Sequence, residues 1–400
     1  MRVAYVVSRF PNQSETFIVR ELQVVSADPE LELELFSLFP SKNAFEHRSA
    51  ARWTRGIRRP GVGEALQGAA WWMLRSPVRV LGILKRVLGA TYRSPRIAAR
   101  SVLTVPIALV HARRVRAAGI GHVHAHFATY PALTAWVCHR LTGVPFSYTA
   151  HAHDLYVDDS LLRLTLPEAR FVATISEFNR KLIAGYGAET PVELVHCGVD
   201  PGQYRFVPRR VPDEGPVSTL CVASLQDKKG HEVLLEALAA PGLDRLHVRL
   251  VGDGPLRPEL ERLARTLGIS SRVDFMGSRD ETEVRALLDE ADLFVLPSRV
   301  ARDGQMEGLP VVLIEAVACG VPTVATRLSG IPELIADGET GWLAEPGDPQ
   351  SLRAKLEEAV AEGAPASLDA GRALVEREFD QGESGRRIST LIQRGYRGLA

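Results

Sequence analysis

The sequence predicts two parallel α/β domains in series, each a sheet with helices on both faces. Strand-like and helix-like patterns alternate almost throughout the 400 residues. The alternation stops in a proline-rich stretch from Pro201 to Pro216 and then restarts. Because alternating strands and helices build parallel sheets covered by helices, two such series imply two doubly wound domains with a cleft between them. The hydrophobic content of 46% and the charged content of 24% are typical of a globular chain and exclude a disordered one.

The first domain is predicted to span residues 1–200. Its strand patterns are short apolar runs, and the segments between them have helical periodicity. Ser176 and the residues after it have the pattern of a helix N-terminus. The expected strands are 1–7, 31–39, 122–126, 146–150, 171–175 and 192–196, and the expected helices are 14–25, a basic helical segment over 48–118, 132–141 and one from residue 176.

The second domain is predicted to span residues 201–380. Ligands of doubly wound sheets lie at the carboxyl ends of the strands, so we expect functional residues in the loops that follow them. The C-terminal helix, 381–400, is expected to pack back on the first domain. The expected strands are 217–224, 246–251, 273–275, 293–296 and 323–325, and the expected helices are 231–238, 258–267, 281–289, 310–319 and a helical tail.

The cysteines and the start of the chain bear on the compartment. Four cysteines lie far apart and form no CxxC pair, which is typical of reduced thiols in a cytoplasmic protein. The first apolar run is too short for a signal peptide and is interpreted as a strand. No uncharged apolar run approaches the roughly 18 residues of a membrane-spanning helix. We therefore expect a cytoplasmic protein.

The net charge is zero, but one segment is strongly basic. Between Arg48 and Arg116 there are fifteen lysines and arginines and one acid, Glu64, which leaves +14. Such a segment is either a solvated helical surface or a face for anionic lipid or an anionic acceptor. Apolar residues at helical spacing favour an interfacial amphipathic helix. No known nucleic-acid-binding module surrounds the segment, so we expect no nucleic-acid partner. The apolar residues are Trp71, Trp72, Leu74, Val80, Leu81, Leu84, Val87 and Leu88.

Two glutamates, Glu307 and Glu315, stand eight residues apart around the start of the predicted helix 310–319. Pro310 suits the first helical turn, where its missing N–H costs nothing, and free N–H groups at such a start attract phosphate. Eight helical residues rise about 12 Å, roughly the span of a nucleotide-sugar from sugar to ribose. Two ordinary solvated acids are the alternative, but Glu315 lies in an apolar helix where an unpaired carboxylate is costly. The spacing therefore favours a nucleotide-sugar site.

Three histidines, His122, His124 and His126, alternate along one predicted strand and so share one face. With His151 and His153 they could form a metal site, as in a hydrolase. Histidines at strand ends, one of them functional, are the alternative that we favour. No D-x-D motif occurs, so we expect no metal.

Several segments together resemble the GT-4 family of glycosyltransferases, which have the two-domain GT-B fold with two Rossmann-like domains. Residues 307–316 resemble the E-x7-E signature of that family. Other segments are similar to a bacterial branch that builds exopolysaccharides such as colanic acid. These segments are 8–17, 124–128, 146–154, 175–179, 297–298 and 301–304.

The resemblance implies roles for residues at matching positions. Glu307, with the N–H groups of Gly308 and Leu309, would hold the transferred sugar ahead of Pro310, and Glu315 would bind the ribose. Lys229 would meet the diphosphate, and His151 would lie near the reacting carbon. The family usually has a phosphate-binding arginine where this chain has Ser224, so Lys228 or Arg302 would compensate. Gly252 and Gly277 are expected near the donor, although a tight turn also explains Gly252. The residues expected on the acceptor side are Ser14, Glu15, Thr16, His153 and Asp154.

The function implied by the resemblance is retaining transfer of a sugar from a UDP- or GDP-linked donor, without metal or other cofactor. The acceptor would be a glycan or lipid-linked glycan held by the first domain, and the second domain would bind the donor. The enzyme would work in exopolysaccharide or cell-surface polysaccharide biosynthesis, docked on the anionic inner face of the cell membrane. Two alternatives stay open: a metal-dependent hydrolase that uses the histidines, and a binding protein weakened in catalysis by Ser224.

Overall fold

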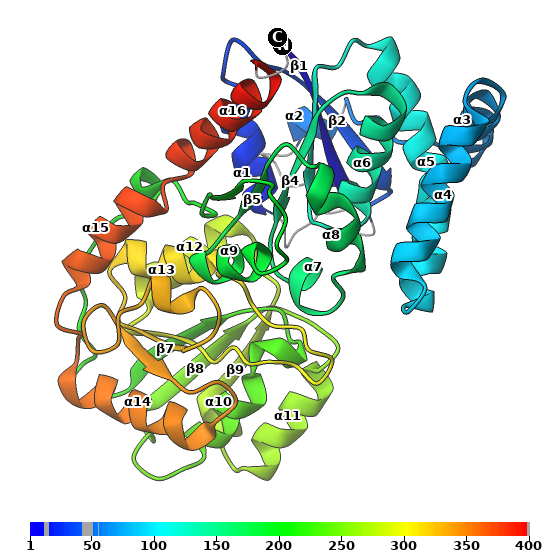
Figure 1. Cartoon of the computed structure of the whole chain (residues 1–400). Helices are drawn as coiled ribbons and strands as arrows, with labels where there is room; N and C mark the ends of the chain where they lie inside the picture. Colours follow the sequence, from blue (N-terminus) through cyan, green and yellow to red (C-terminus); the bar gives the residue numbers. More distant parts are fainter. Residues whose placement is uncertain (12–15, 42–50, 55, 398–400) are drawn as a thin grey trace. The chain divides into compact units, whose positions relative to one another are not determined.

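The computed structural model describes residues 1–11, 16–41, 51–54 and 56–397 (Figure 1). The chain divides into two compact units, and each is described by itself. The first unit comprises Met1–His196 and Gln381–Ala400, and the second comprises Cys197–Asp380. Each unit contains a six-stranded parallel sheet with helices, so the predicted α/β class of two doubly wound sheets is confirmed.

The sheet of the first unit has the strand order β2-β1-β3-β4-β5-β6. The order reverses between β1 and β3, and such a reversal is where doubly wound sheets bind ligands. The residues that follow β3 and β4 are therefore well placed for function. The strands are β1 (Arg2–Arg9), β2 (Glu32–Phe39), β3 (His122–His126), β4 (Phe146–Ala150), β5 (Val172–Thr174) and β6 (Val192–Leu194).

Helices pack on both faces of this sheet because successive residues of a strand point to opposite sides. Val3, Tyr5 and Val7 join a core that includes residues of α1 and α16, whereas Ala4 and Val6 join a core with α5 and α6. Figure 1 shows α16 beside α1. The helices are α1 (Thr16–Val25), α2 (Ala51–Thr54), α3 (Val62–Arg75), α4 (Pro77–Thr91), α5 (Pro95–Ala117), α6 (Tyr130–Thr142), α7 (His153–Tyr156), α8 (Ser160–Thr165), α9 (Glu177–Ala184) and α16 (Gln381–Arg397).

The sheet of the second unit has the strand order β12-β11-β10-β7-β8-β9. Here the order reverses between β7 and β10, so the loops after these two strands meet at the expected ligand position. The strands are β7 (Val217–Val222), β8 (Leu246–Val251), β9 (Val273–Gly277), β10 (Leu293–Leu296), β11 (Thr323–Thr326) and β12 (Trp342–Ala344). The helices are α10 (His231–Leu238), α11 (Arg257–Thr266), α12 (Glu281–Glu290), α13 (Val311–Cys319), α14 (Pro349–Glu362) and α15 (Leu368–Glu378), with single 3₁₀ turns such as η3 (Pro201–Gln203) and η4 (Asp227–Lys229).

Three sequence-based expectations differ from the structure. The basic segment forms separate helices because Pro77 and Pro95 start new ones, and a residue before proline disfavours helix. Pro310 is the N-cap of α13, and the first helical residue is Val311. The tail after β11 is not wholly helical, because the short apolar run Trp342–Ala344 pairs with β11. Among the described residues no helix is long and apolar enough to cross a membrane.

Candidate active site

Two lysines and one glutamate of the second unit form a buried ion cluster. Lys228 Nζ lies 2.8 Å from Glu307 Oε1, and Lys229 Nζ lies 2.8 Å from Glu307 Oε2. Burial raises the pKa of Glu307, but the two ammonium groups outweigh burial and lower this pKa to about 2. Glu307 is therefore a carboxylate at neutral pH, which accepts hydrogen bonds and has no proton to donate.

The lysines are placed by the turn η4, which follows β7. Gly230 ends the turn with φ +65°, and a Cβ there would lie 2.0 Å from the carbonyl oxygen of Pro297. Only glycine fits such a close approach. The turn is thus held against the end of β10, at the point where the strand order reverses.

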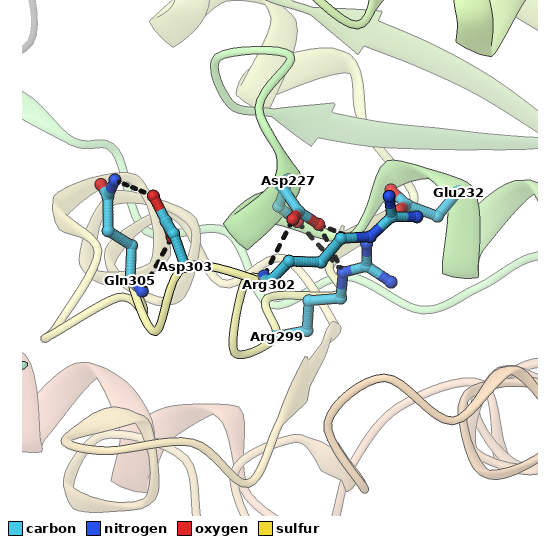
Figure 2. A network of polar contacts seen from close by, with 6 residues as sticks. All are labelled: Asp227, Glu232, Arg299, Arg302, Asp303 and Gln305. Carbon is cyan, nitrogen blue, oxygen red and sulfur yellow. Dashed lines mark hydrogen bonds and ion pairs between the residues drawn. The ribbon is translucent and has the colours of Figure 1, made fainter. Parts of the chain in front are cut away.

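A network of charged side chains fixes the same turn (Figure 2). Arg299 Nε donates to Asp227 Oδ1 at 3.0 Å, and its guanidinium also pairs with Glu232. The main-chain N–H of Arg302 donates to Asp227 Oδ2 at 3.0 Å. These interactions, that of Arg302 first, lower the pKa of Asp227. Arg299 is therefore committed to two carboxylates.

The half-buried Ser224 stands where the resemblance predicts a phosphate-binding arginine. Of the two candidates for compensation, Lys228 has its ammonium group at Glu307 beside that of Lys229. Arg302 instead contributes its main-chain N–H to Asp227, and its side chain is exposed. The geometry favours Lys228 as the second cation of the cluster.

The peptide groups after Glu307 are held by a residue of a distant loop. Ser329 Oγ lies 2.5 Å from the carbonyl oxygen of Glu307 and 2.6 Å from that of Gly308, so its single proton is shared between the two acceptors. Gly308 O also accepts the N–H of Gly330 at 3.1 Å. With these carbonyl groups fixed, the N–H groups of Gly308 and Leu309 keep one direction ahead of α13. The first N–H groups of α13 have no partner within the helix and carry its positive dipole end.

Glu315 lies one and a half turns into α13, 8% exposed. Its Oε1 accepts a hydrogen bond from the hydroxyl of Tyr204 at 2.9 Å. The predicted need for a partner in this apolar helix is thus met by a residue from the proline-rich stretch. The carboxylate is held in one orientation, which suits it to recognise a pair of hydroxyl groups.

Gly252 and Gly277 have mainly a packing role. The N–H of Gly252 donates to the carbonyl oxygen of Gly277 at 2.9 Å. A Cβ on Gly252, whose φ is +139°, would lie 2.0 Å from the carbonyl oxygen of Ala223. The turn after β8 therefore packs directly against the loop that carries Ser224.

In the first unit, β3 and β4 bring His126 and His151 together. His126 Nδ1 lies 3.2 Å from His151 Nε2, and His151 is 5% exposed. The carboxylate of Asp154 accepts the main-chain N–H groups of Ala128, His151 and Ala152 at 2.7–3.1 Å. Asp154 therefore holds the loop of His151 and is buried, a role other than the predicted contact with an acceptor.

The remaining acceptor-side residues have different outcomes. Ser14 and Glu15 lie outside the described residues. Thr16 is the first residue of α1, and His153 is exposed, with its ring centroid 5.0 Å from that of Phe127. The structure records no hydrogen bond between His151 and either Thr16 or His153.

The other strand histidines are hydrogen-bonded within the sheet. Ser147 Oγ lies 2.7 Å from His122 Nε2 and 2.8 Å from His124 Nδ1. Glu21, His124 and His126 offer ligand atoms within 4.8 Å of one another, which is the arrangement that a metal site would need. His126 Nε2 also lies 3.2 Å from Glu21 Oε1, within ion-pair distance, so direct contact of these two side chains accounts for the same geometry.

The basic segment has two different apolar faces. Trp72, Val80 and Val87 are buried in the core, whereas Leu81 and Leu88 are exposed. The prediction of a single interfacial stripe is therefore wrong. Val80 and Val87 are buried in the core of the first unit, and Leu84 packs against that core. A second stripe on α4 is exposed and consists of Val78, Leu81, Lys85 and Leu88, followed by the exposed C-cap residue Tyr92.

Two family models match this chain, one in each half. The model of "Glycosyltransferase Family 4" matches residues 32–203, and that of "Glycosyl transferases group 1" matches residues 206–372. The chain belongs to this glycosyltransferase family. The recognition from sequence motifs is confirmed, and so is the prediction that the chain is a glycosyltransferase.

Related proteins carry names from polysaccharide synthesis. The amylovoran biosynthesis glycosyltransferase AmsK of Erwinia amylovora is 29% identical over 418 residues, covering 98% of this chain and 100% of that protein. WcaL of Escherichia coli, named for colanic acid biosynthesis, is 38% identical over 210 residues, covering 50% of this chain and 51% of that protein.

Solved structures share the fold. HepE of Anabaena, in complex with UDP and glucose, matches with a TM-score of 0.71 and 18% identity, covering 98% of this chain and 100% of that one. Sucrose-phosphate synthase of Thermosynechococcus elongatus matches with a TM-score of 0.74 and 18% identity, covering all of both chains. The GT-B fold predicted from the resemblance is confirmed.

Sequence reasoning missed the partners of the predicted site residues. Tyr204, Asp227, Ser329 and Glu21 each support such a residue, and none belongs to a motif used to find the site. Tyr204 and Glu315 are 111 residues apart. The one local signal is the Ser329-Gly330 pair, because Ser329 has φ +47° and such turns favour serine and glycine.

Proposed function

We propose that this glycosyltransferase moves a sugar, with retention of configuration, from a UDP- or GDP-linked donor to a glycan or lipid-linked glycan. The proposed process is the biosynthesis of an exopolysaccharide or other cell-surface polysaccharide, which the names of AmsK and WcaL support. The observation that carries the donor proposal is the cluster of Lys228, Lys229 and Glu307 before α13.

The cluster can bind both the transferred sugar, through Glu307, and the leaving diphosphate, through the two lysines. Each ammonium group has three N–H donors, so a lysine can keep Glu307 and also bind a phosphate oxygen. Departure of a nucleoside diphosphate leaves negative charge on phosphate, which the lysines and the N-terminus of α13 stabilise. No proton or metal ion is required at this step, so we propose a metal-independent reaction.

The two glutamates have separate proposed roles. Glu307 is ionised and accepts hydrogen bonds from hydroxyl groups of the transferred sugar, while Glu315, held by Tyr204, binds the ribose. Retention of configuration by a front-face substitution is what the family resemblance implies. Glu315, at the ribose, would be too distant from the reacting carbon for a covalent intermediate of the glycosidase kind.

The test is a thermal-shift screen with UDP, GDP, ADP and their sugars, followed by turnover of the stabilising donor. A ligand present at 100 times its Kd stabilises by about 2.7 kcal/mol, which a melting curve resolves. We expect one uridine or guanosine nucleotide to raise the Tm and its sugar to be transferred equally well in EDTA. Activity lost to EDTA and restored by a divalent cation would refute the metal-independent reaction.

We also propose that the exposed stripe of α4 docks the enzyme on the anionic cytoplasmic face of the cell membrane. Arg79 and Arg86 flank the stripe and line a groove of about 610 Å³ together with Val78, His139 and Arg140. Apolar side chains beside cations are the pattern of an interfacial helix. Each basic residue near an anionic surface adds about 1 kcal/mol, so docking would be reversible and sensitive to salt.

A further inference from the structure

Four buried or half-buried polar side chains of the first unit form one line of close polar contacts, two of which are hydrogen bonds. Tyr5 Oη lies 3.1 Å from Glu21 Oε1, and the same oxygen lies 3.2 Å from His126 Nε2. His126 Nδ1 in turn lies 3.2 Å from His151 Nε2. The line connects a carboxylate on α1 with the histidine that the resemblance places near the reacting carbon.

The carboxylate of Glu21 has no proton to donate, and this determines which atom is the donor and which the acceptor in each contact of the line. A carboxylate only accepts, so Tyr5 donates its hydroxyl proton to Glu21. His126 Nε2 lies 3.2 Å from the same carboxylate oxygen without the alignment of a hydrogen bond, and a proton on Nε2 avoids placing its lone pair against that oxygen. Burial, and then the neighbouring Glu21, raise the pKa of Tyr5 well above its usual value, which keeps this donor protonated. In a neutral His126 the other nitrogen, Nδ1, is then an acceptor.

The same reasoning determines which ring nitrogen of His151 carries the proton. Since His126 Nδ1 accepts, His151 must donate from Nε2, and its own Nδ1 then carries a lone pair. Burial lowers the pKa of His151 well below its usual value, so the ring is neutral at physiological pH. In a neutral ring that donates its only N–H, at Nε2, to His126, the other nitrogen, Nδ1, can accept a hydrogen bond from another molecule.

The ring and the main chain of His151 are also locked. The ring centroids of Phe17 and Phe127 lie 4.6 Å and 4.7 Å from that of His151. Asn179 Nδ2 donates to the carbonyl oxygen of His151 at 2.6 Å, and Asp154 accepts its N–H. Phe127 adopts φ +78°, a conformation rare outside glycine and common at functional sites.

We infer that Glu21 and His126 are positioning residues that hold His151 as the Nε2–H tautomer, so that its Nδ1 accepts a hydrogen bond from a hydroxyl group of a bound sugar. This rests on the proposed sugar transfer for the role of His151, but the tautomer itself does not. Glu21 and His126 act through His151 and need not touch a substrate.

The test reads the tautomer directly in the full chain without substrate. Two-bond ¹⁵N–¹H correlation spectra of protein labelled at histidine distinguish a protonated ring nitrogen from a bare one, and His151→Gln assigns the signal. We expect His151 with a protonated Nε2 and a bare Nδ1. A protonated Nδ1 in the wild-type chain would overturn the inference.

Variants at Glu21 and His126 test whether these two residues determine the tautomer of His151. Glu21→Ala and His126→Phe should give mixed tautomers of His151, whereas His126→Asn retains an acceptor oxygen close to the Nδ1 position and should restore the wild-type spectrum. Glu32→Ala, the same change at an exposed carboxylate paired with Arg2, is the matched control and should leave the spectrum of His151 unchanged. A wild-type spectrum of His151 in both folded Glu21→Ala and His126→Phe would refute the relay.

Kinetics add a second readout. Loss of one oriented hydrogen bond should lower kcat about tenfold in Glu21→Ala and His126→Phe with little change in the KM for donor, and His126→Asn should recover most of it. An unchanged kcat in Glu21→Ala with a mixed tautomer would refute the role in transfer. A wild-type chain without transferase activity would instead refute the proposed function and leave the tautomer result intact. EDTA should not alter the spectrum, because a shift of the His126 signal on chelation would show that Glu21, His124 and His126 hold a metal.

Discussion

At the scale of single residues, the most informative group is Glu307, a buried carboxylate between two ammonium groups. Replacement by glutamine keeps the shape, removes the charge and leaves Lys228 and Lys229 close together without a counter-ion. We expect Glu307→Gln to lower kcat at least about 100-fold, the scale seen when one oriented polar group of a transition state is lost. Transfer assays with the donor found by thermal shift measure this, and near wild-type turnover would contradict the assigned role.

The same residue makes stability depend on pH. The folded pKa of Glu307 is about 2 and its ordinary value is 4.5, so the stabilisation is complete above about pH 4.5 and is lost as the pH falls toward 2. Two and a half pH units correspond to about 3 kcal/mol. The free energy of unfolding of the wild type should therefore exceed that of Glu307→Gln at pH 7, and the difference should shrink below pH 4.5. A difference that stays constant down to pH 3 would show that the ion cluster contributes nothing.

Lys228 provides a second test at this scale, because we propose that it replaces the phosphate-binding arginine expected at Ser224. Lys228→Met should raise the Kd for the nucleoside diphosphate about tenfold or more, since a charged hydrogen bond contributes about 1.5–3 kcal/mol. Ser224→Arg should tighten the same Kd. Calorimetric titration measures both, with the exposed Lys181→Met of the first unit as the control. Unchanged affinity in Lys228→Met would leave Lys229 as the sole phosphate cation of this cluster.

At the scale of elements, α4 shows how one helix can serve two surfaces. Val80, Ile83 and Val87 are buried in the core, while Val78, Leu81 and Leu88 are exposed beside Lys85. Leu81→Gln with Leu88→Gln should leave the Tm unchanged and reduce binding to anionic vesicles. Ile83→Ala should cost about 2–5 kcal/mol of stability and leave vesicle binding of the folded protein unchanged. Co-sedimentation with neutral and anionic vesicles at two salt concentrations measures the first effect, and equal partition onto both vesicle types would refute docking by charge.

The sequence patterns predicted most of the helices and strands correctly and missed others. Long alternations such as that around β7, α10 and β8 were predictable because apolar spacing alone distinguishes strand from helix. The strand Trp342–Ala344 was missed because its short apolar run falls in the segment that was interpreted as a helical tail, and pairing with β11 makes it a strand. The proposed site residues Glu307, Glu315 and His151 followed from motifs. The residues that support them, Ser329, Tyr204 and Glu21, come from distant parts of the chain. Contacts of that kind depend on how the elements pack, which local pattern does not encode.

At the scale of the whole molecule, the division of the chain predicts which pieces fold alone. Residues 197–380 form one continuous unit that contains Lys228, Lys229, Glu307, Glu315 and Tyr204. The first unit instead needs the C-terminal helix α16, because Ile388 and Ile392 are fully buried in the core with Val3 and Ile18. We expect fragment 197–380 to unfold cooperatively and to bind the nucleoside diphosphate within about tenfold of the full chain, since its cation cluster is complete.

Fragment 1–196, in contrast, should melt without a cooperative transition, because without α16 it exposes the apolar side chains that Ile388 and Ile392 cover. Adding a peptide of residues 381–397 should raise its stability in a concentration-dependent way, since a ligand that binds only the folded state stabilises it. Replacing both isoleucines of the peptide by serine should abolish the effect, while replacing the exposed Arg386 by serine should not. Cooperative unfolding of 1–196 alone, at the Tm of the full chain, would show that α16 is an accessory to the first unit and not part of its core.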